Sequence, residues 1–270
     1  MDRPILWHLP VSHYGEKVRW ALDHKAIQHD RHAPLTGYHI AVALVLTRGR
    51  SHTLPVLELA GRRFGDSTEI IAALERAYPH DKLYPDDPDE RRQALELEDF
   101  FDEQLGPPVR RYAFHALQSD HETFDELASG QVPPMLARYR GLVGAYARGY
   151  TALRFKATSD DGAHQAFAKI LAAFDRIESE LGDGQYLVGD RFTVADLTAA
   201  ALFYPFVLPP EGPVQMEPPA TLASARASVQ DRPGYRYVLN MYERHRARGA
   251  SRAPATPAPI SLGARPDSSR

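Results

Sequence analysis

The stretch ILWHLPVSHYGEKVRWAL, residues 5–22, carries the strongest fold signal in this sequence. It opens with a short apolar run, Ile5 to Leu9, that stops at Pro10, as expected of a buried strand. Apolar side chains then recur at helical spacing, at Tyr14, Val18, Ala21 and Leu22. The stretch therefore predicts a strand, a turn and a helix, with Ser12 at the turn.

The residues that follow predict the rest of one small α/β unit. They indicate a weak second strand, a short helix ended by Gly49, a clear strand, a tight turn at Gly61 with a return strand, and a last helix. In order, the ranges are Gln28 to Ala33, Ile40 to Leu46, Leu54 to Leu59, Arg62 to Phe64, and a helix marked by Ile70, Ile71, Leu74 and Tyr78. This order, βαβαββα, predicts a partly parallel sheet with an antiparallel edge.

A segment rich in proline and aspartate, PHDKLYPDDP at residues 79–88, breaks both periodicities as an interdomain linker would. The patterned segments after it are helical. They are Leu95 to Leu105, interrupted or kinked by Gly106 to Pro108, then Met135 to Phe155, Phe167 to Leu181, Thr193 to Phe206, part of Leu222 to Val229, and Tyr235 to His245. We therefore expect a first domain over residues 1–80, a linker over 81–88, an all-helical domain over 89–246 and a disordered tail over 247–270, rich in Pro, Ala and Arg.

Composition excludes several classes of function. The longest apolar run, Leu197 to Leu208, is too short for a bilayer and contains Pro205, so we expect a cytoplasmic protein with no membrane contact. A formal net charge of -3 gives no field that would attract nucleic acid. The 12 histidines are scattered, and no metal site is expected. Because the chain has no cysteine, any sulfur chemistry must use the sulfur of a ligand.

Three helix or strand beginnings could bind a ligand, although each also has a purely structural explanation. Ser12 could stabilise a thiolate or other anion at a helix N-terminus, or could simply cap that helix. Pro55 opens a buried strand; a cis peptide bond there would let Leu54 pair with an extended ligand, whereas a trans bond would be ordinary. The amide and hydroxyl of Ser67 could hold a carboxylate at the next helix N-terminus, although the capping box that Asp66 forms with Glu69 would alone explain these residues.

A fourth motif, FTVADL at residues 192–197, has a structural explanation for every residue. Thr193 is the expected N-cap, and Asp196 takes the place of the glutamate in a capping box. Phe192 and Leu197 would form a hydrophobic staple. We therefore assign this motif to folding, not to chemistry.

The four motifs occur in one order and at one set of spacings, and together they resemble the glutathione S-transferase superfamily over roughly residues 4–246. The resemblance implies an α/β thioredoxin-like N-terminal domain followed by an all-α domain. It places Ser12 at the catalytic turn, Leu54 and Pro55 at the glutathione backbone, and Asp66 with Ser67 at the γ-glutamyl group. It also implies a cytosolic homodimer, often with a role in detoxification, that uses glutathione as co-substrate against a small electrophile.

The sequence also departs from the family pattern. The catalytic turn has Ser12 and Gly15 where related classes often have cysteines, so disulfide chemistry by a protein thiol is excluded. The segment between Gly49 and Pro55 is longer than usual, and Arg50 and His52 are the candidates there for the glycine carboxylate of glutathione.

Three functions remain open at this point. The first is a serine-type transferase in which Ser12 stabilises the thiolate of glutathione or of a similar small thiol, with Tyr14 as the alternative hydroxyl. The second is a binding or scaffold protein that keeps the fold without catalysis, and the third is a regulator that acts through protein partners.

Overall fold

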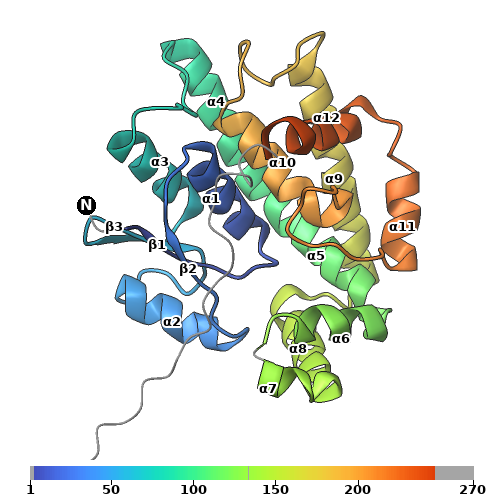
Figure 1. Cartoon of the computed structure of the whole chain (residues 1–270). Coiled ribbons are helices and arrows are strands. Elements are labelled where there is room, and N and C mark those ends of the chain that lie inside the picture. The colour runs from blue at the N-terminus through green and yellow to red at the C-terminus, as the bar shows by residue number, and fades with distance from the viewer. Residues whose placement is uncertain (1–2, 133, 247–270) are drawn as a thin grey trace, which may run out of the picture.

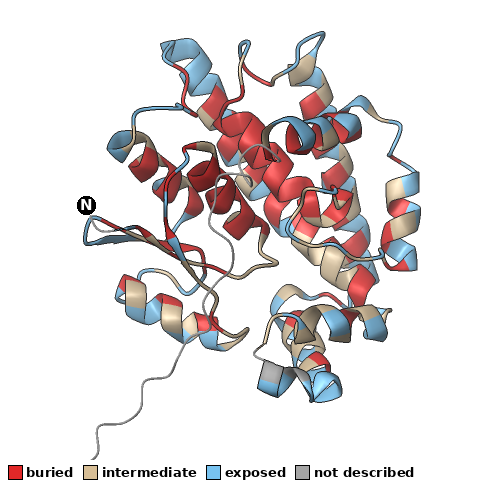
Figure 2. Cartoon of the chain, in the orientation of Figure 1, coloured by how far each residue is buried: buried red, intermediate tan, exposed pale blue. Residues whose placement is uncertain are grey.

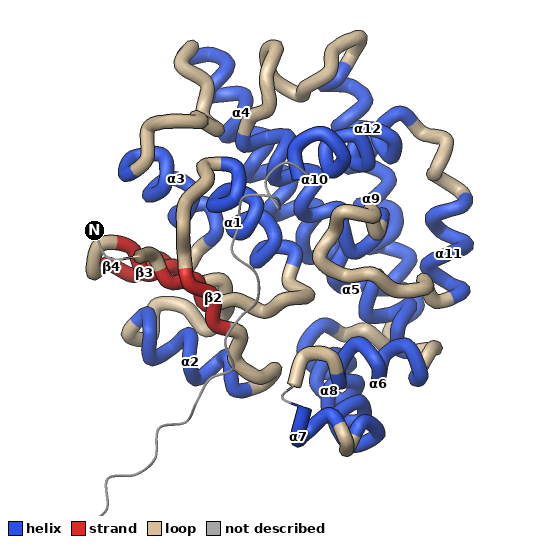
Figure 3. The backbone as a smooth tube through the Cα atoms, in the orientation of Figure 1, coloured by secondary structure: helices blue, strands red, loops and turns tan. Residues whose placement is uncertain are grey.

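The computed structural model describes residues 3–132 and 134–246, in which a small sheet with three helices adjoins a larger helical bundle (Figure 1; Figure 3). The predicted tail, residues 247–270, lies outside the described residues. No helix within the described ranges is long and apolar enough to cross a membrane.

The first domain has the predicted order βαβαββα. Its strands are β1 (Ile5–Trp7), β2 (Asp30–His32), β3 (Val56–Leu59) and β4 (Arg62–Phe64), and its helices are α1 (His13–His24), α2 (Tyr38–Thr47) and α3 (Ser67–Ala77). The strands lie in the order β2-β1-β3-β4; β1 runs parallel to β2 and antiparallel to β3, which pairs antiparallel with β4. Helices α1 and α3 cover the face of the sheet toward the bundle, and α2 covers the other face (Figure 1).

The rest of the described chain is helical. Its helices are α4 (Pro88–Phe100), the π-helical η1 (Phe101–Leu105), α5 (Gly106–Gln118), α6 (His121–Ser129), α7 (Pro134–Ala137), α8 (Arg140–Phe155), α9 (Asp160–Leu181), α10 (Val194–Val207), α11 (Ala220–Ala227), α12 (Pro233–Met241) and η2 (Tyr242–Arg246). Every residue of α10 apart from Pro205 is buried, and this helix packs against α1, α4, α5 and α12 (Figure 2). The two-part division that we propose, residues 1–80 and 89–246 around a linker, follows this change of architecture.

Two groups of buried ion pairs connect α1 to the helical domain. Lys17 is fully buried, and its Nζ lies 2.8 Å from Glu98 and 2.6 Å from Asp102. Arg246, the last described residue, lies 2.6 Å from Glu16 and 2.8 Å from Asp23. Removing one partner of such a pair leaves an uncompensated buried charge, which costs about 3–5 kcal/mol. These pairs therefore fix the position of α1, the helix whose first turn faces the candidate site.

The predicted capping box at the start of α10 is present. The main-chain N–H and the hydroxyl of Thr193 donate to Asp196 Oδ2 at 2.7 and 2.8 Å. Asp196 Oδ1 accepts two further bonds, from the Leu187 main-chain N–H and from the Tyr237 hydroxyl. This carboxylate therefore joins the start of α10 both to the preceding loop and to α12.

The structure corrects the helix pattern between residues 112 and 155. We expected one helix from Met135 to Phe155, but α7 and α8 are separate there, and α6 was not anticipated. The sequence does contain a start signal for α6, namely an aspartate at the N-cap. In the structure Asp120 accepts a hydrogen bond from the Thr123 N–H at 3.0 Å, and Phe124 is buried. The expected interruption near Gly106 is confirmed, since α4 passes through the π-helical segment before α5 begins at that glycine.

Candidate active site

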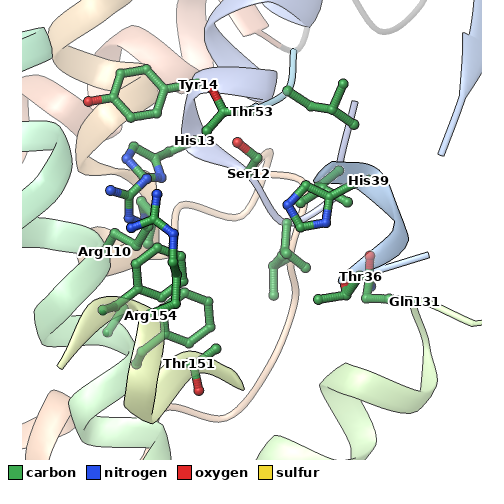
Figure 4. Close-up of a pocket in the computed structure, with 18 of the residues that line it drawn as sticks. Ser12, His13, Tyr14, Thr36, His39, Thr53, Arg110, Gln131, Thr151 and Arg154 are labelled. Carbon is green, nitrogen blue, oxygen red and sulfur yellow. The ribbon is translucent and has the colours of Figure 1, made fainter. Parts of the chain in front are cut away.

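A cavity of about 660 Å³ lies between the first domain and the helical domain (Figure 4). Its walls include all six residues predicted from the sequence, which are Ser12, Tyr14, Leu54, Pro55, Asp66 and Ser67. The two walls differ in origin. We call the wall contributed by α1, α3 and the segment 51–55 the thiol wall, and the wall contributed by α5, α6 and α8 the second wall.

Ser12 lies at the N-terminus of α1, immediately before its first residue. Its backbone is extended, and its Oγ accepts a hydrogen bond from the Gly15 N–H at 3.1 Å, so it does cap the helix. That bond uses a lone pair and leaves the hydroxyl proton free to donate. Within residues 3–132 and 134–246, no acceptor for that proton is present. The capping role and a donor role toward a ligand are thus compatible in one side chain.

The segment before β3 presents main-chain groups to the cavity. The peptide bond between Leu54 and Pro55 is cis, which is the alternative that would let Leu54 pair with an extended ligand. The Leu54 side chain is buried with Ala43 and Val56 on the α2 side of the sheet. Neither the N–H nor the C=O of Leu54 has a hydrogen-bond partner in the described ranges. Both groups are therefore available to an extended, peptide-like ligand.

Asp66 and Ser67 lie at the N-terminus of α3. Asp66 is the N-cap, and its Oδ1 accepts from the Thr68 and Glu69 N–H groups at 2.9 and 3.1 Å. Ser67 is buried, and its hydroxyl makes no hydrogen bond to another described residue. Free amides and an unpaired hydroxyl at a helix N-terminus favour a bound carboxylate.

Tyr14 is poorly placed for the donor role considered for it. Its hydroxyl donates to the Asp102 carbonyl at 2.6 Å, which uses its one proton. Burial, and then the charge of Asp102, raise its pKa well above the usual value. The ring lies so close to Gly106 that a side chain on that glycine would collide with the hydroxyl. Tyr14 therefore joins α1 to α5 and has no second proton for a ligand.

The second wall contains polar groups that the sequence did not single out. Arg110 of α5 and Arg154 of α8 both stack on Phe155, with guanidinium carbons 4.6 and 5.5 Å from the ring centroid. Neither forms an ion pair within the described residues. Figure 4 shows both guanidinium groups on the side of the cavity where His13 lies. The sequence contains no local pattern that would link these two arginines, because they are separated by more than forty positions in the chain.

Two histidines of the cavity are buried and neutral near pH 7. Burial, and then the charge of Arg110, lower the pKa of His13 to about 3. Its Nε2 has no hydrogen-bond partner, whereas its ring stacks against Tyr14. Burial also lowers the pKa of His39, whose Nδ1 accepts from the Gly37 N–H at 2.9 Å. Neither ring can supply a positive charge for an anion at neutral pH.

The structure separates the two candidates for the glycine carboxylate. Arg50 donates to the main-chain carbonyls of Thr47 and Arg63, away from the cavity. His52 lines the cavity, 3.4 Å from a guanidinium nitrogen of Arg154. Among the residues that the structure describes, no group of three or more His, Cys, Asp or Glu side chains is arranged to bind a metal.

Comparison with known proteins agrees with this architecture. Residues 6–85 match the family described as glutathione S-transferase, N-terminal domain, and residues 134–234 match glutathione S-transferase, C-terminal domain. No curated protein matched the sequence significantly. The chain therefore belongs to the glutathione S-transferase superfamily by its two domain matches.

Solved structures share the fold at low sequence identity. The β-etherase LigF from Sphingobium sp. strain SYK-6 is 20% identical with a TM-score of 0.57, over 88% of this chain and 99% of that chain. A glutathione S-transferase from Rhodospirillum rubrum F11 is 22% identical with a TM-score of 0.54, over 87% and 91%. A glutathione transferase homologue from Drosophila mojavensis, solved with bound glutathione, is 21% identical with a TM-score of 0.52, over 94% and 99%. These similarities establish the fold alone.

Proposed function

We propose that this protein is a serine-type glutathione transferase that activates the thiol of glutathione for attack on a small electrophile. Ser12 donates its free hydroxyl proton to the thiolate, and the N-terminus of α1 adds its dipole. The observation that carries the proposal is the uncommitted Ser12 hydroxyl in the same cavity as the unpaired main chain of Leu54 and the N-terminus of α3.

The energies required are compatible with these groups. Lowering a thiol pKa from about 8.5 to about 6.5 needs roughly 2.7 kcal/mol of stabilisation of the thiolate. A hydrogen bond to a charged atom contributes about 1.5–3 kcal/mol. A helix N-terminus contributes about 0.3–1 kcal/mol more. One hydroxyl and one helix end are therefore sufficient.

The thiol wall also supplies groups that match the rest of glutathione. The free N–H and C=O of Leu54 suit the main chain of its cysteinyl residue, as in strand addition. Asp66 retains an oxygen that does not cap α3, and this oxygen suits the γ-glutamyl ammonium group. Ser67 suits the γ-glutamyl carboxylate. We propose this orientation, with the thiol directed at Ser12.

Calorimetric titration tests the binding part of the proposal. We expect glutathione to bind and cysteinylglycine, which lacks the γ-glutamyl group, to bind much more weakly. The variant Ser67→Ala should weaken glutathione binding about fivefold, the value of one hydrogen bond of about 1 kcal/mol. The exposed residue Ser228 at the end of α11 offers a control, since Ser228→Ala should leave the affinity unchanged. Absence of heat with every small thiol would favour the scaffold function instead.

We also propose that the protein acts in the cytoplasm as a homodimer, and that exposed apolar side chains form the contact surface. The exposed large apolar side chains of the described chain lie on α2 or within residues 135–153, at Tyr38, Leu44, Val45, Met135, Leu136, Tyr139, Leu142, Tyr146 and Leu153. Surfaces of this kind are typical of interaction sites.

A further inference from the structure

We propose that the second substrate is an anion: an electrophile whose apolar or aromatic body ends in a carboxylate or a similar group, held by Arg110 and Arg154. This inference rests on the proposed function of the cavity and specifies which electrophiles it accepts.

The two guanidinium groups converge from different helices. Arg110 projects from the second turn of α5, and Arg154 from the last turn of α8. Each lies over the ring of Phe155, so the two cations share one aromatic surface. Figure 4 shows them next to each other below His13, with Ser12 across the open part of the cavity. An anion between them would lie in the same cavity as the thiol site.

The charge of this pair is not compensated within the described chain. Neither arginine forms an ion pair there, and Arg110 makes no hydrogen bond. Burial, and the like charge of Arg154, lower the pKa of Arg110. Because a guanidinium stays protonated, the site keeps two positive charges, of which Arg110 is half-buried and Arg154 is exposed. An anion bound between them would offset the partial desolvation of Arg110.

The acidic residues of the cavity do not neutralise the arginines. Asp102 accepts from Lys17 at 2.6 Å and from Thr68 at 2.7 Å. Asp99 and Glu103 also line the cavity, but neither pairs with Arg110 or Arg154. A carboxylate brought by the substrate would thus be the first to reach these two guanidinium groups.

The surroundings of the pair are apolar and determine the rest of the ligand. Beside Phe155, the second wall consists mainly of Phe114, Leu117, Phe124, Leu127, Val143 and Tyr150. Apolar walls with a few placed polar groups are typical of small-molecule sites. The ligand that fits this part of the cavity therefore has an apolar body with one anionic end.

The reaction needs no further reactant. The thiolate of glutathione attacks the carbon that bears the leaving group, a C–S bond forms, and the bond to the leaving group breaks. The leaving group departs as an anion with the bonding electron pair. The thiol proton has already passed to solvent.

Two aryl chlorides that differ in charge test the inference: 4-chloro-3-nitrobenzoate and its methyl ester. Each rate is divided by its uncatalysed rate with glutathione, so that intrinsic reactivity cancels. We expect wild type to favour the acid. Arg110→Met should lower kcat/KM for the acid about 10- to 100-fold, the value of a charge-assisted pair, and affect the ester less. Arg110→Lys, which keeps the charge but loses the planar fork, should fall between them.

Two controls separate this effect from a folding defect. Arg92→Gln changes an exposed arginine of α4 and should keep the acid-to-ester ratio of wild type. Arg154→Met changes an exposed partner in the pair and should lower the ratio in the same direction as Arg110→Met. The melting temperature of Arg110→Met should not fall, because methionine keeps the apolar stem and removes a desolvated charge.

Binding of 2-naphthoate, which cannot react, distinguishes this inference from the proposed function. If neither chloride is conjugated but 2-naphthoate binds and Arg110→Met abolishes binding, the anion site stands and the transferase function fails. If the ester is conjugated as well as the acid and Arg110→Met leaves the ratio unchanged, the inference is overturned while the function stands. Weaker glutathione binding in Arg110→Met with an unchanged ratio would assign the arginines to a carboxylate of glutathione, and would also overturn it.

Discussion

The two walls of the cavity differ in how their polar groups are satisfied. On the thiol wall, Ser12 and Asp66 each complete a helix N-terminus and keep one further atom for a ligand. On the second wall, the half-buried Arg110 has no ion-pair or hydrogen-bond partner among the described residues, and the buried His13 has none for its Nε2. Here His13 belongs to α1 but points to the second wall (Figure 4). In our proposal, one wall serves folding and ligand binding together, whereas the other carries groups that helix capping and ion pairing within the described chain do not use.

This contrast separates residues that stabilise the fold from residues that would select the substrate. A capping side chain contributes to the fold whether or not a ligand is bound. A half-buried cation without an anionic partner makes no such contribution. We therefore expect substitutions in the supporting framework to cost stability, and substitutions in the second wall to change selectivity.

The largest expected effect is that of Asp196→Ala, which removes the capping carboxylate of α10, the helix that packs against both α1 and α5. Capping alone would cost about 1 kcal/mol, as the sequence suggested. The structure adds two buried donors, the Leu187 N–H and the Tyr237 hydroxyl, that would lose their acceptor. Because each unsatisfied buried group costs about 1–3 kcal/mol, we expect the free energy of unfolding to fall by roughly 3–7 kcal/mol. Denaturant titration of wild type and variant measures this difference in the free energy of unfolding.

Glutathione affinity below the melting transition serves as the companion measurement for Asp196→Ala. Because we assign Asp196 to folding and not to ligand binding, the glutathione affinity of each folded molecule should be unchanged. A stable variant that has lost glutathione binding would contradict the assignment of this motif to folding.

A smaller effect, about 2 kcal/mol, is the pH dependence that His13 gives to the free energy of unfolding. The pKa of His13 is about 3 in the folded chain and about 6.5 when unfolded. The unfolded chain therefore binds the proton first, so the stability contribution is complete above pH 6.5 and is lost as the pH falls toward 3. Between pH 7 and 5 His13 alone should cost about 2 kcal/mol of unfolding free energy.

Comparison of wild type with His13→Asn isolates that contribution. The variant should lose about 2 kcal/mol less between pH 7 and 5, while His164→Asn, an exposed histidine of α9, should behave as wild type. Equal pH dependence in wild type and His13→Asn would show that His13 does not stay neutral in the folded chain.

The sequence predicted the first domain and the thiol wall because their signals are local. Ser12, Asp66 and Thr193 are helix caps, and a cap is recognised from the few residues around it. The order βαβαββα was also predicted from local signals, namely the hydrophobic periodicity and the turn residues. Strand ends were less accurate: β1 ends at Trp7 and β3 begins at Val56, where the pairing register ends the ladder.

The second wall could not be predicted, because packing and not local pattern creates it. Arg110 and Arg154 resemble ordinary surface arginines in the sequence, and their convergence depends on how α5 packs against α8. The position of α8 also depends on a contact between distant parts of the chain. Tyr146 of α8 packs against Gly37, so contact with the first domain helps to position this helix.

The ultraviolet absorbance of the thiolate of bound glutathione, measured against pH, tests whether Ser12 donates a hydrogen bond to the sulfur. If Ser12 donates to the sulfur, Ser12→Ala removes a bond worth about 1.5–3 kcal/mol and raises the thiol pKa by roughly one to two units. Ser12→Thr, which keeps both the cap and the hydroxyl, should titrate like wild type. Tyr14→Phe should also do so, since its proton is already used. Overlapping curves for wild type and Ser12→Ala would contradict the serine mechanism and leave Ser12 as a helix cap.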